Sequence, residues 1–198
     1  MNVIEHYDIL VDENNDPLRD PRYLQDYMDK WDGAPFLNAM QLQGSENVLE
    51  IGVGTGRLAI RVLPLCKSFT GIDISPKTIE RARENLLEYH NADLICADFN
   101  NYCFNTKFDI IYSSLTLFHF EDKQAFVNKV ASLLAADGRF VLSIDKSQST
   151  YIDMGTRKLR IYPDTLDNVT SCLSAGKMVL VKHSETEFAH ILIAEKRS

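Results

Sequence analysis

The sequence has 198 residues, of which 45% are hydrophobic and 25% charged, and its 28 acidic against 21 basic residues give a formal charge of −7. Length and composition predict a single globular domain over residues 1–198, and they exclude a collagen-like or largely disordered chain. The negative charge argues against nucleic acid or an anionic membrane surface as a partner, because the phosphate groups of both would be repelled.

The sequence gives no sign of a targeting or membrane-spanning segment. Its first residues lack a basic stretch followed by an apolar one, and no apolar run approaches the roughly 20 residues that span a bilayer. The four cysteines form no CxxC pair, which argues against a zinc knuckle or a disulfide framework. These features predict a soluble, reduced protein of the cytoplasm.

Residues 1–45 are polar and aromatic and are expected to form an N-terminal helical cap segment. Within it, Asp20 followed by Pro21 is typical of a helix start. The pattern predicts one helix over 21–30 and a second over 35–42.

From residue 47 onward, apolar runs alternate with helical periodicity, the pattern of βαβ units on a parallel sheet. The runs predict strands over 47–51, 69–74, 93–97, 108–113 and 139–144, and helices over 58–65, from Pro76, and over 126–134. Two last apolar runs, 177–182 and 187–194, are close together and predict an antiparallel hairpin. The expected fold class is α/β: a Rossmann-like seven-stranded sheet of five parallel strands plus a C-terminal antiparallel hairpin, with helices on both faces.

The first predicted strand runs into three glycines at alternate positions, Gly52, Gly54 and Gly56, and then into a helix. Glycine lets the chain turn sharply and lets a ligand approach the backbone, and a helix N-terminus offers unpaired N–H groups. A dinucleotide fingerprint would need its third glycine at position 57, where the chain has Arg57. Glu50, two residues before the first glycine, would repel a pyrophosphate but could accept hydrogen bonds from an ammonium group.

Gly-x-Gly-x-Gly after an acidic residue resembles the first motif of the class I S-adenosylmethionine-dependent methyltransferases. The resemblance extends over most of the chain, including the entry into the fifth strand and the closing hairpin. It implies S-adenosylmethionine as the cofactor and a small-molecule methyl acceptor as the partner. It also implies that the glycine turn and Glu50 hold the cofactor.

The resemblance assigns further cofactor contacts to the ends of successive strands. Asp73, 21 residues after the first glycine, would hold both ribose hydroxyls, since one carboxylate can accept two hydrogen bonds, and Ile74 would pack on the adenine. Asp98 would accept from the adenine amino group with Phe99 near the ring, and Ser113 would meet the methionine part. Asp73 or Asp98 alone would more often be a solvated loop carboxylate, so their order along the sheet edge carries the interpretation.

Methyl transfer from a sulfonium gains mainly from alignment of the reactants, so no universal catalytic residue is required. His119, just beyond the fourth strand, is the candidate general base for a hydroxyl or an acidic carbon, although a loop histidine is often structural. Tyr7 and Tyr27 are proposed to close the site, with Tyr27 counted among the cofactor-binding residues. The alternative is that these aromatics only pack their helix on the sheet.

Three features of the sequence exclude some classes of methyl acceptor. Residues 112–115 read Tyr-Ser-Ser-Leu, unlike the Asn/Asp-Pro-Pro-aromatic sequence of enzymes that act on nucleobase amines. Asp145, after the fifth strand, has no evident companion carboxylates, so no metal is expected. The stretch 146–162 is too short for an inserted lid domain, which favours a small or exposed acceptor.

Two other functional classes remain open. The first is a non-catalytic module that binds S-adenosylmethionine or S-adenosylhomocysteine, which motif residues alone cannot separate from an enzyme. The second is an NAD-dependent oxidoreductase. The early third glycine and the lack of a recognisable Tyr-x-x-x-Lys or Cys/His set for hydride transfer argue against it.

Overall fold

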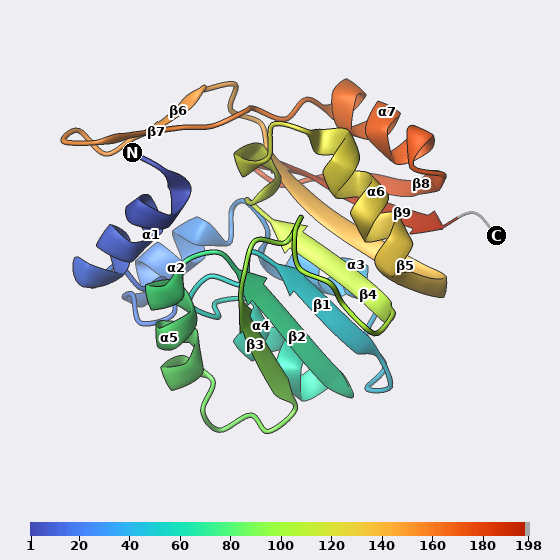
Figure 1. Ribbon diagram of the computed structural model, residues 1–198, viewed down its shortest axis with the longest axis horizontal. Coiled ribbons are helices and arrows are strands. Elements are labelled where there is room, and N and C mark those ends of the chain that lie inside the picture. Colours follow the sequence, from blue (N-terminus) through green and yellow to red (C-terminus); the bar gives the residue numbers. More distant parts are fainter. Residues whose placement is uncertain (197–198) are drawn as a thin grey trace.

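The computed structural model describes residues 1–196, which form a seven-stranded sheet with helices on both faces (Figure 1). The strands are β1 (Asn47–Ile51), β2 (Ser68–Asp73), β3 (Ala92–Cys96), β4 (Phe108–Ser114), β5 (Leu134–Asp145), β8 (Met178–Glu185) and β9 (Ala189–Lys196). Their order is β3-β2-β1-β4-β5-β9-β8. The first five are parallel, and β9 and β8 form the antiparallel hairpin. The predicted fold class is confirmed.

The helices are α1 (Val3–Asp12), α2 (Arg22–Met28), α3 (Gly33–Met40), α4 (Ala59–Val62), α5 (Pro76–Asn85), α6 (Lys123–Leu133) and α7 (Leu166–Ala175). Two short 3-10 turns, η1 (Leu63–Leu65) and η2 (Leu117–His119), follow α4 and β4. The helix expected over 58–65 is shorter than predicted, because Pro64 lies in η1 and cannot donate the next helical hydrogen bond.

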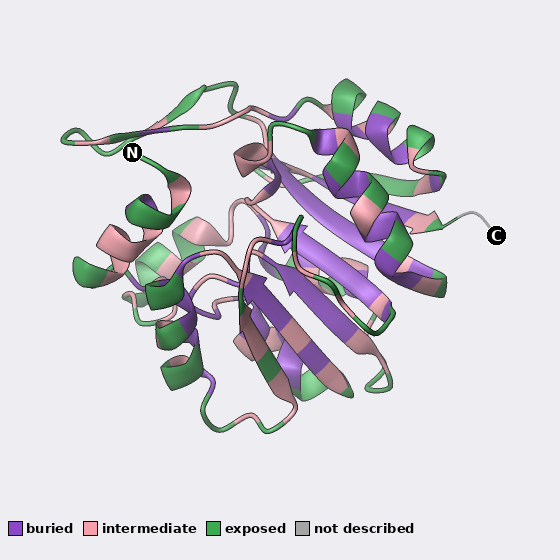
Figure 2. Cartoon of the chain, in the orientation of Figure 1, coloured by how far each residue is buried: buried purple, intermediate pink, exposed green. Residues whose placement is uncertain are grey.

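The sheet is buried on both faces, as Figure 2 shows for its central strands. One apolar cluster lies beneath α6 and α7 and includes Phe126, Phe140 and Val169. The other lies beneath α3, α4 and α5 and includes Phe36, Val62 and Ile79. The helices cover both faces of the sheet but leave the carboxyl ends of the parallel strands accessible. Ligands bind at these strand ends in α/β folds.

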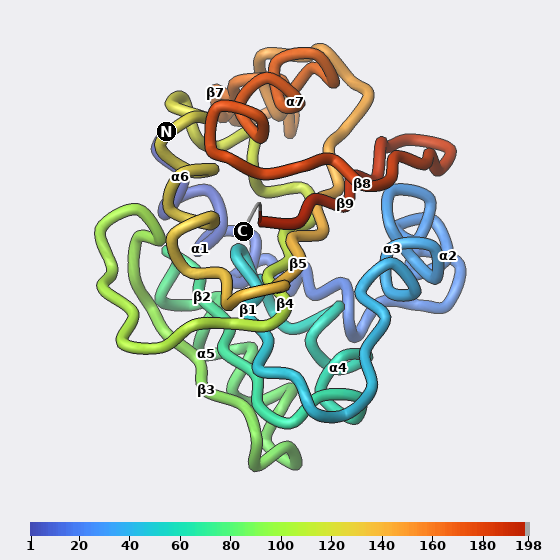
Figure 3. Tube along the Cα trace, turned by 90° about the vertical axis from the view of Figure 1, so that its right-hand side faces the viewer, coloured from blue at the N-terminus to red at the C-terminus, as the bar shows by residue number. Residues whose placement is uncertain are grey.

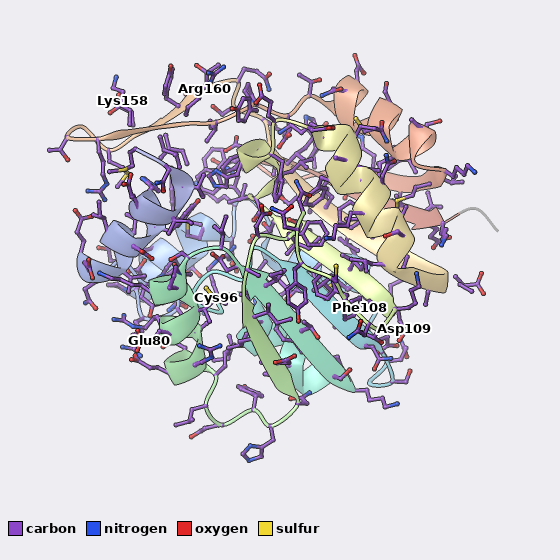
Figure 4. All side chains as sticks on the ribbon, in the orientation of Figure 1. Glu80, Cys96, Phe108, Asp109, Lys158 and Arg160 are labelled. Atoms are coloured by element: carbon purple, nitrogen blue, oxygen red, sulfur yellow. The ribbon has the colours of Figure 1, made fainter. Side chains whose placement is uncertain are left out.

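The sequence predictions gave no range for α7 or η2, and two further elements were absent from them. One is α1, whose N-terminus is a capping box: the Asn2 side chain accepts from the Glu5 N–H, and the Glu5 side chain accepts from the Asn2 N–H. The other is a two-stranded ribbon, β6 (Tyr151–Asp153) and β7 (Lys158–Arg160). Lys158 and Arg160 point from β7 into solvent (Figure 4), while Leu159 between them is buried.

Within residues 1–196, no helix has both the length and the apolar character that a membrane crossing requires.

Candidate functional site

A cavity of about 400 Å³ lies at the carboxyl ends of β1, β2, β3 and β4. One side of its wall comes from the strand ends and the turns after them: residues 50–55, 57, 58, 72–74, 97–99, 114–116, 119 and 120. The other side comes from the N-terminal segment: Val3, Tyr7, Leu10, Val11, Asn15, Pro17 and Met28. The parallel topology thus gathers residues far apart in sequence around one space.

The glycine turn after β1 forms the floor of this cavity. Gly52 has a φ of +79° and its N–H donates to the Ile72 carbonyl at 2.8 Å, while a Cβ at this position would lie 2.2 Å from the Thr116 hydroxyl oxygen. Gly54 lines the cavity, and a Cβ there would meet no atom within 4 Å. Gly56 lies outside the wall and packs against Leu86 instead, so its role is to shape the turn.

Asp73, at the end of β2, holds the glycine turn and faces the cavity. Its carboxylate accepts from the Gly54 N–H at 3.1 Å and from the Ser75 N–H at 3.0 Å. Burial raises the pKa of this carboxyl, and the two backbone donors only partly offset the effect. Two hydrogen bonds leave lone pairs of the carboxylate free for a ligand.

Glu50, the acidic residue of β1, is 3% exposed and also lines the cavity. It accepts a hydrogen bond of 2.7 Å from the Tyr112 hydroxyl. Burial raises the pKa of the Glu50 carboxyl well above its usual value, despite that hydrogen bond and the nearby Arg57 guanidinium. A cation placed beside Glu50 would therefore favour its ionised form.

Arg57 is a cavity residue that the sequence analysis did not assign to the site. Its guanidinium donates to both carboxylate oxygens of Asp32, and it reaches Asp29 at 3.3 Å. Asp32 is fully buried and also accepts from the Ser114 hydroxyl at 2.7 Å. This network joins the start of α3 to the glycine turn and to the end of β4.

Ile74, Asp98 and Phe99 all lie in the cavity wall. Asp98 accepts from the Asn100 N–H at 2.9 Å and from the Asn101 side chain at 2.7 Å, which fixes its carboxylate after β3. The Phe99 ring is 3% exposed and packs against Phe126, with 5.2 Å between ring centroids. The ends of β1, β2 and β3 thus each bring a carboxylate to one cavity.

Besides Gly56, two residues predicted for the site lie outside the cavity wall. Ser113 is fully buried and donates to the Ile51 carbonyl at 3.0 Å, a contact between strands. Tyr27 packs edge-on against Trp31 at 5.4 Å and lies 5.8 Å from Phe188, on the surface of α2. Their neighbours, Ser114 and Met28, are in the wall instead.

Tyr7 of α1 and His119 of η2 meet inside the cavity. The Tyr7 hydroxyl lies 2.8 Å from His119 Nε2, so one donates a hydrogen bond to the other. Burial lowers the pKa of His119 to about 3, helped by the charges of His6 and Lys123, and burial together with Asp73 raises the pKa of Tyr7. At neutral pH both side chains are therefore uncharged.

A buried lysine fixes the η2 turn that carries His119. Lys123 Nζ donates to the carbonyls of Leu117 at 2.8 Å and of Tyr162 at 2.7 Å, and it pairs with Asp164 at 2.7 Å. The sequence offers no local signal for the ion pair, because Lys123 and Asp164 are 41 positions apart and meet only in the folded chain.

Helix α1 covers the cavity, and polar contacts on two sides of the helix hold it in place. Its Asp8 accepts from the Ser75 hydroxyl at 2.7 Å, next to α5. Glu13, just after α1, forms a two-pronged ion pair with Arg157 of the β6–β7 ribbon. The capping box at Asn2 and Glu5 is a sequence signal that could have revealed this helix.

A parallel sheet of this order, closed by an antiparallel hairpin and carrying a glycine turn with acidic strand ends, is the class I methyltransferase architecture. Residues 48–138 match the family described as "Methyltransferase domain". Nodulation protein S of Sinorhizobium fredii is 33% identical over 98 residues, which cover 48% of this chain and 45% of that protein. A malonyl-[acyl-carrier protein] O-methyltransferase of Ilyobacter polytropus is 34% identical over 102 residues, covering 49% of this chain and 37% of that protein.

Among solved structures, the fold is similar to that of the N-methyltransferase NodS of Bradyrhizobium japonicum in complex with S-adenosyl-L-homocysteine. The TM-score is 0.74 with 19% identity, covering 97% of this chain and 98% of that one. Residues 48–138 thus match a methyltransferase-domain family, and the chain has the fold of a solved methyltransferase structure. Its matches span less than half the length of the two curated relatives.

Proposed function

We propose that this protein transfers a methyl group from S-adenosylmethionine to a small-molecule acceptor by in-line displacement. The observation that carries the proposal is the convergence of Glu50, Asp73 and Asp98, from the ends of three successive strands, on one cavity floored by the glycine turn. The methyltransferase-domain family that residues 48–138 match supports the same reaction.

The polar groups of the cavity fit the parts of S-adenosylmethionine. Asp73 has lone pairs free for a vicinal diol, and the open space at Gly54 admits a ligand against the backbone. Glu50, whose carboxyl is protonated more readily than usual, would be ionised by an ammonium group. Asp98 and the apolar Ile74 and Phe99 would hold the adenine. When bound, S-adenosylmethionine supplies an electrophilic methyl group on its sulfonium.

The remaining wall is where an acceptor would lie. It is largely apolar, with Leu10, Leu115 and Phe120 among its residues, and its polar groups include the pair of Tyr7 and His119. A histidine whose pKa is about 3 is a weak base at neutral pH. We therefore infer that the pair positions an acceptor that is already nucleophilic, such as a neutral amine or a carboxylate. Both kinds of acceptor atom are found among similar proteins, since one is named an N-methyltransferase and another an O-methyltransferase.

We further infer that nucleic acid is not the acceptor and that the protein works in the cytoplasm. The formal charge of −7 supports the first inference, because a nucleic-acid backbone would be repelled. The second is supported by four cysteines that are free thiols, as a reducing compartment would keep them.

Calorimetry with S-adenosylmethionine, S-adenosylhomocysteine and NAD, followed by a methyl-acceptor screen of small amines and carboxylates, tests the proposal. We expect both adenosyl ligands to bind, NAD to give no heat, and at least one acceptor to be methylated. Binding of NAD alone would overturn the cofactor assignment. Tight adenosyl binding with no turnover on any acceptor would support the non-catalytic module instead.

Replacing Tyr7 with phenylalanine should lower kcat by about tenfold or more and leave the Kd for S-adenosylhomocysteine nearly unchanged. The hydroxyl is the only part removed, and it is the group that contacts His119 at 2.8 Å. The matched control is Tyr23→Phe, at a tyrosine that is 70% exposed and outside the cavity. A Tyr7→Phe variant with full turnover would remove Tyr7 from the mechanism.

A further inference from the structure

The hairpin β8–β9 carries two histidines and a glutamate on one face. Glu185 of β8 pairs directly with His190 of β9, and His183 lies two residues before Glu185. Because side chains alternate along a strand, residues two apart share a face, so the ladder brings all three together. None of the three lines the cavity, and each is at least partly open to solvent.

The distances between the donor atoms match those between ligands on one metal ion. His183 Nε2 lies 3.1 Å from His190 Nδ1, and Glu185 Oε1 lies 3.4 Å from the same Nδ1. All three donor atoms are within 4.8 Å of one another. Ligands about 2.0–2.1 Å from a tetrahedral Zn²⁺ are about 3.3 Å apart, so only small side-chain rotations would bring the three onto one ion.

We propose that His183, Glu185 and His190 form a binding site for a divalent transition-metal ion of the Zn²⁺ type, separate from the methyl-transfer cavity. The ion would take the place of the hydrogen bond between the two imidazoles. Two imidazoles and one carboxylate suit Zn²⁺, Ni²⁺ or Cu²⁺, whereas Mg²⁺ and Ca²⁺ prefer oxygen ligands throughout. Water would complete a tetrahedral set at the exposed side.

A second contact orients the carboxylate for this role. Glu185 Oε2 is 2.9 Å from Lys146 Nζ, which also donates to the Thr186 carbonyl at 2.8 Å. With Oε2 engaged in this way, Oε1 is the oxygen that faces His190. Hydrogen-bonded carboxylate ligands are a common feature of metal sites, because the outer contact fixes the ligand.

The site lies next to a junction between the hairpin and the N-terminal helices. The Phe188 N–H donates to the Lys30 carbonyl at 3.1 Å, and the Thr186 hydroxyl donates to the Trp31 carbonyl at 3.2 Å. Figure 3 shows this tip of the hairpin beside α2 and α3. An ion that links the two strands would therefore stabilise the tip and the segment that it contacts.

Zn²⁺ titration of the tag-free protein against a chromophoric chelator, together with thermal unfolding, tests the proposal. We expect one ion per chain, a Tm that rises with Zn²⁺ concentration, and no competition from Mg²⁺. His183→Ala and His190→Ala should each weaken binding by at least about tenfold, and Glu185→Gln should weaken it as well.

Two controls separate this site from others. His90→Ala removes an exposed histidine elsewhere on the surface and should leave Zn²⁺ affinity unchanged. Lys146→Gln removes the ion pair that orients Glu185 but none of the three ligands, so it should weaken Zn²⁺ binding less than either histidine variant. Equal Zn²⁺ affinity in the wild type and in both histidine variants, or no binding with Zn²⁺ in excess, would overturn the proposal. All these readouts are independent of methyl transfer.

Discussion

Replacing Asp73 with alanine should weaken S-adenosylmethionine binding by about a hundredfold, which corresponds to about 2.7 kcal/mol. The carboxylate has two roles at once, because it accepts from the Gly54 and Ser75 N–H groups and faces the cavity with its remaining lone pairs. Its loss would leave a ligand's hydroxyl donors without a partner and would release the glycine turn. Calorimetry with S-adenosylhomocysteine, which is not consumed, measures the effect directly.

The control is Asp93→Ala, an exposed aspartate on the neighbouring strand β3 that lies outside the cavity. Thermal unfolding of ligand-free Asp73→Ala distinguishes lost binding from lost folding. Burial raises the folded-state pKa of Asp73, so ionisation of this group costs stability as pH rises above its unfolded pKa. Removing the carboxyl eliminates that cost at neutral pH. A folded variant that binds the ligand as tightly as wild type would contradict the assignment.

The second large effect is expected for Gly52→Ala, which should lower the free energy of unfolding by about 3 kcal/mol and the Tm by about 6–12 °C. A Cβ at this position would lie 2.2 Å from the Thr116 hydroxyl oxygen and 2.6 Å from its methyl carbon. The φ of +79° adds a backbone cost that any L side chain would meet. Chemical and thermal denaturation both measure the loss.

Gly155→Ala is the matched control for this prediction. Gly155 has a φ of +76°, and a Cβ there would meet no atom within 4 Å, so this variant carries the backbone cost alone, about 1 kcal/mol. The difference between the two variants isolates the clash with Thr116. If Gly52→Ala is as stable as Gly155→Ala, or more stable, the glycine turn does not pack closely against Thr116 and the prediction is contradicted.

The parallel sheet could be predicted because its signals are local. Runs such as 47–51 and 108–113 are mostly apolar, as expected of strands buried on both faces, and turn or cap residues separate them from the helices. The ribbon β6–β7 was missed because its strands have three residues each and are mostly exposed, so they show too few apolar positions for a period to appear.

The acidic half of the site could also be predicted, since topology alone brings the ends of parallel strands to one edge. The contacts between α1 and the loops at that edge could not be predicted from the sequence. The hydrogen bond between Tyr7 and His119 joins residues 112 positions apart and depends on how α1 lies over the sheet. Ser113 was named where Ser114 lines the wall, a shift of one residue that exchanges the two faces of a strand. Tyr27 lies outside the wall while Met28 of the same helix lies in it, and the composition of a helix does not reveal which of its faces is turned inward.

The two sides of the cavity wall come from separate parts of the chain. The carboxylates and the glycine turn lie between residues 50 and 99, whereas the apolar side comes largely from residues 114–120 and from residues 3–28, which precede the family match over 48–138. Under the proposed function, substitutions in α1 or η2 would therefore change which acceptor binds and leave the binding of S-adenosylmethionine intact. This division allows related proteins to differ in the acceptor that they bind through changes in α1 and η2, while the glycine turn and the carboxylates at the strand ends are inherited unchanged.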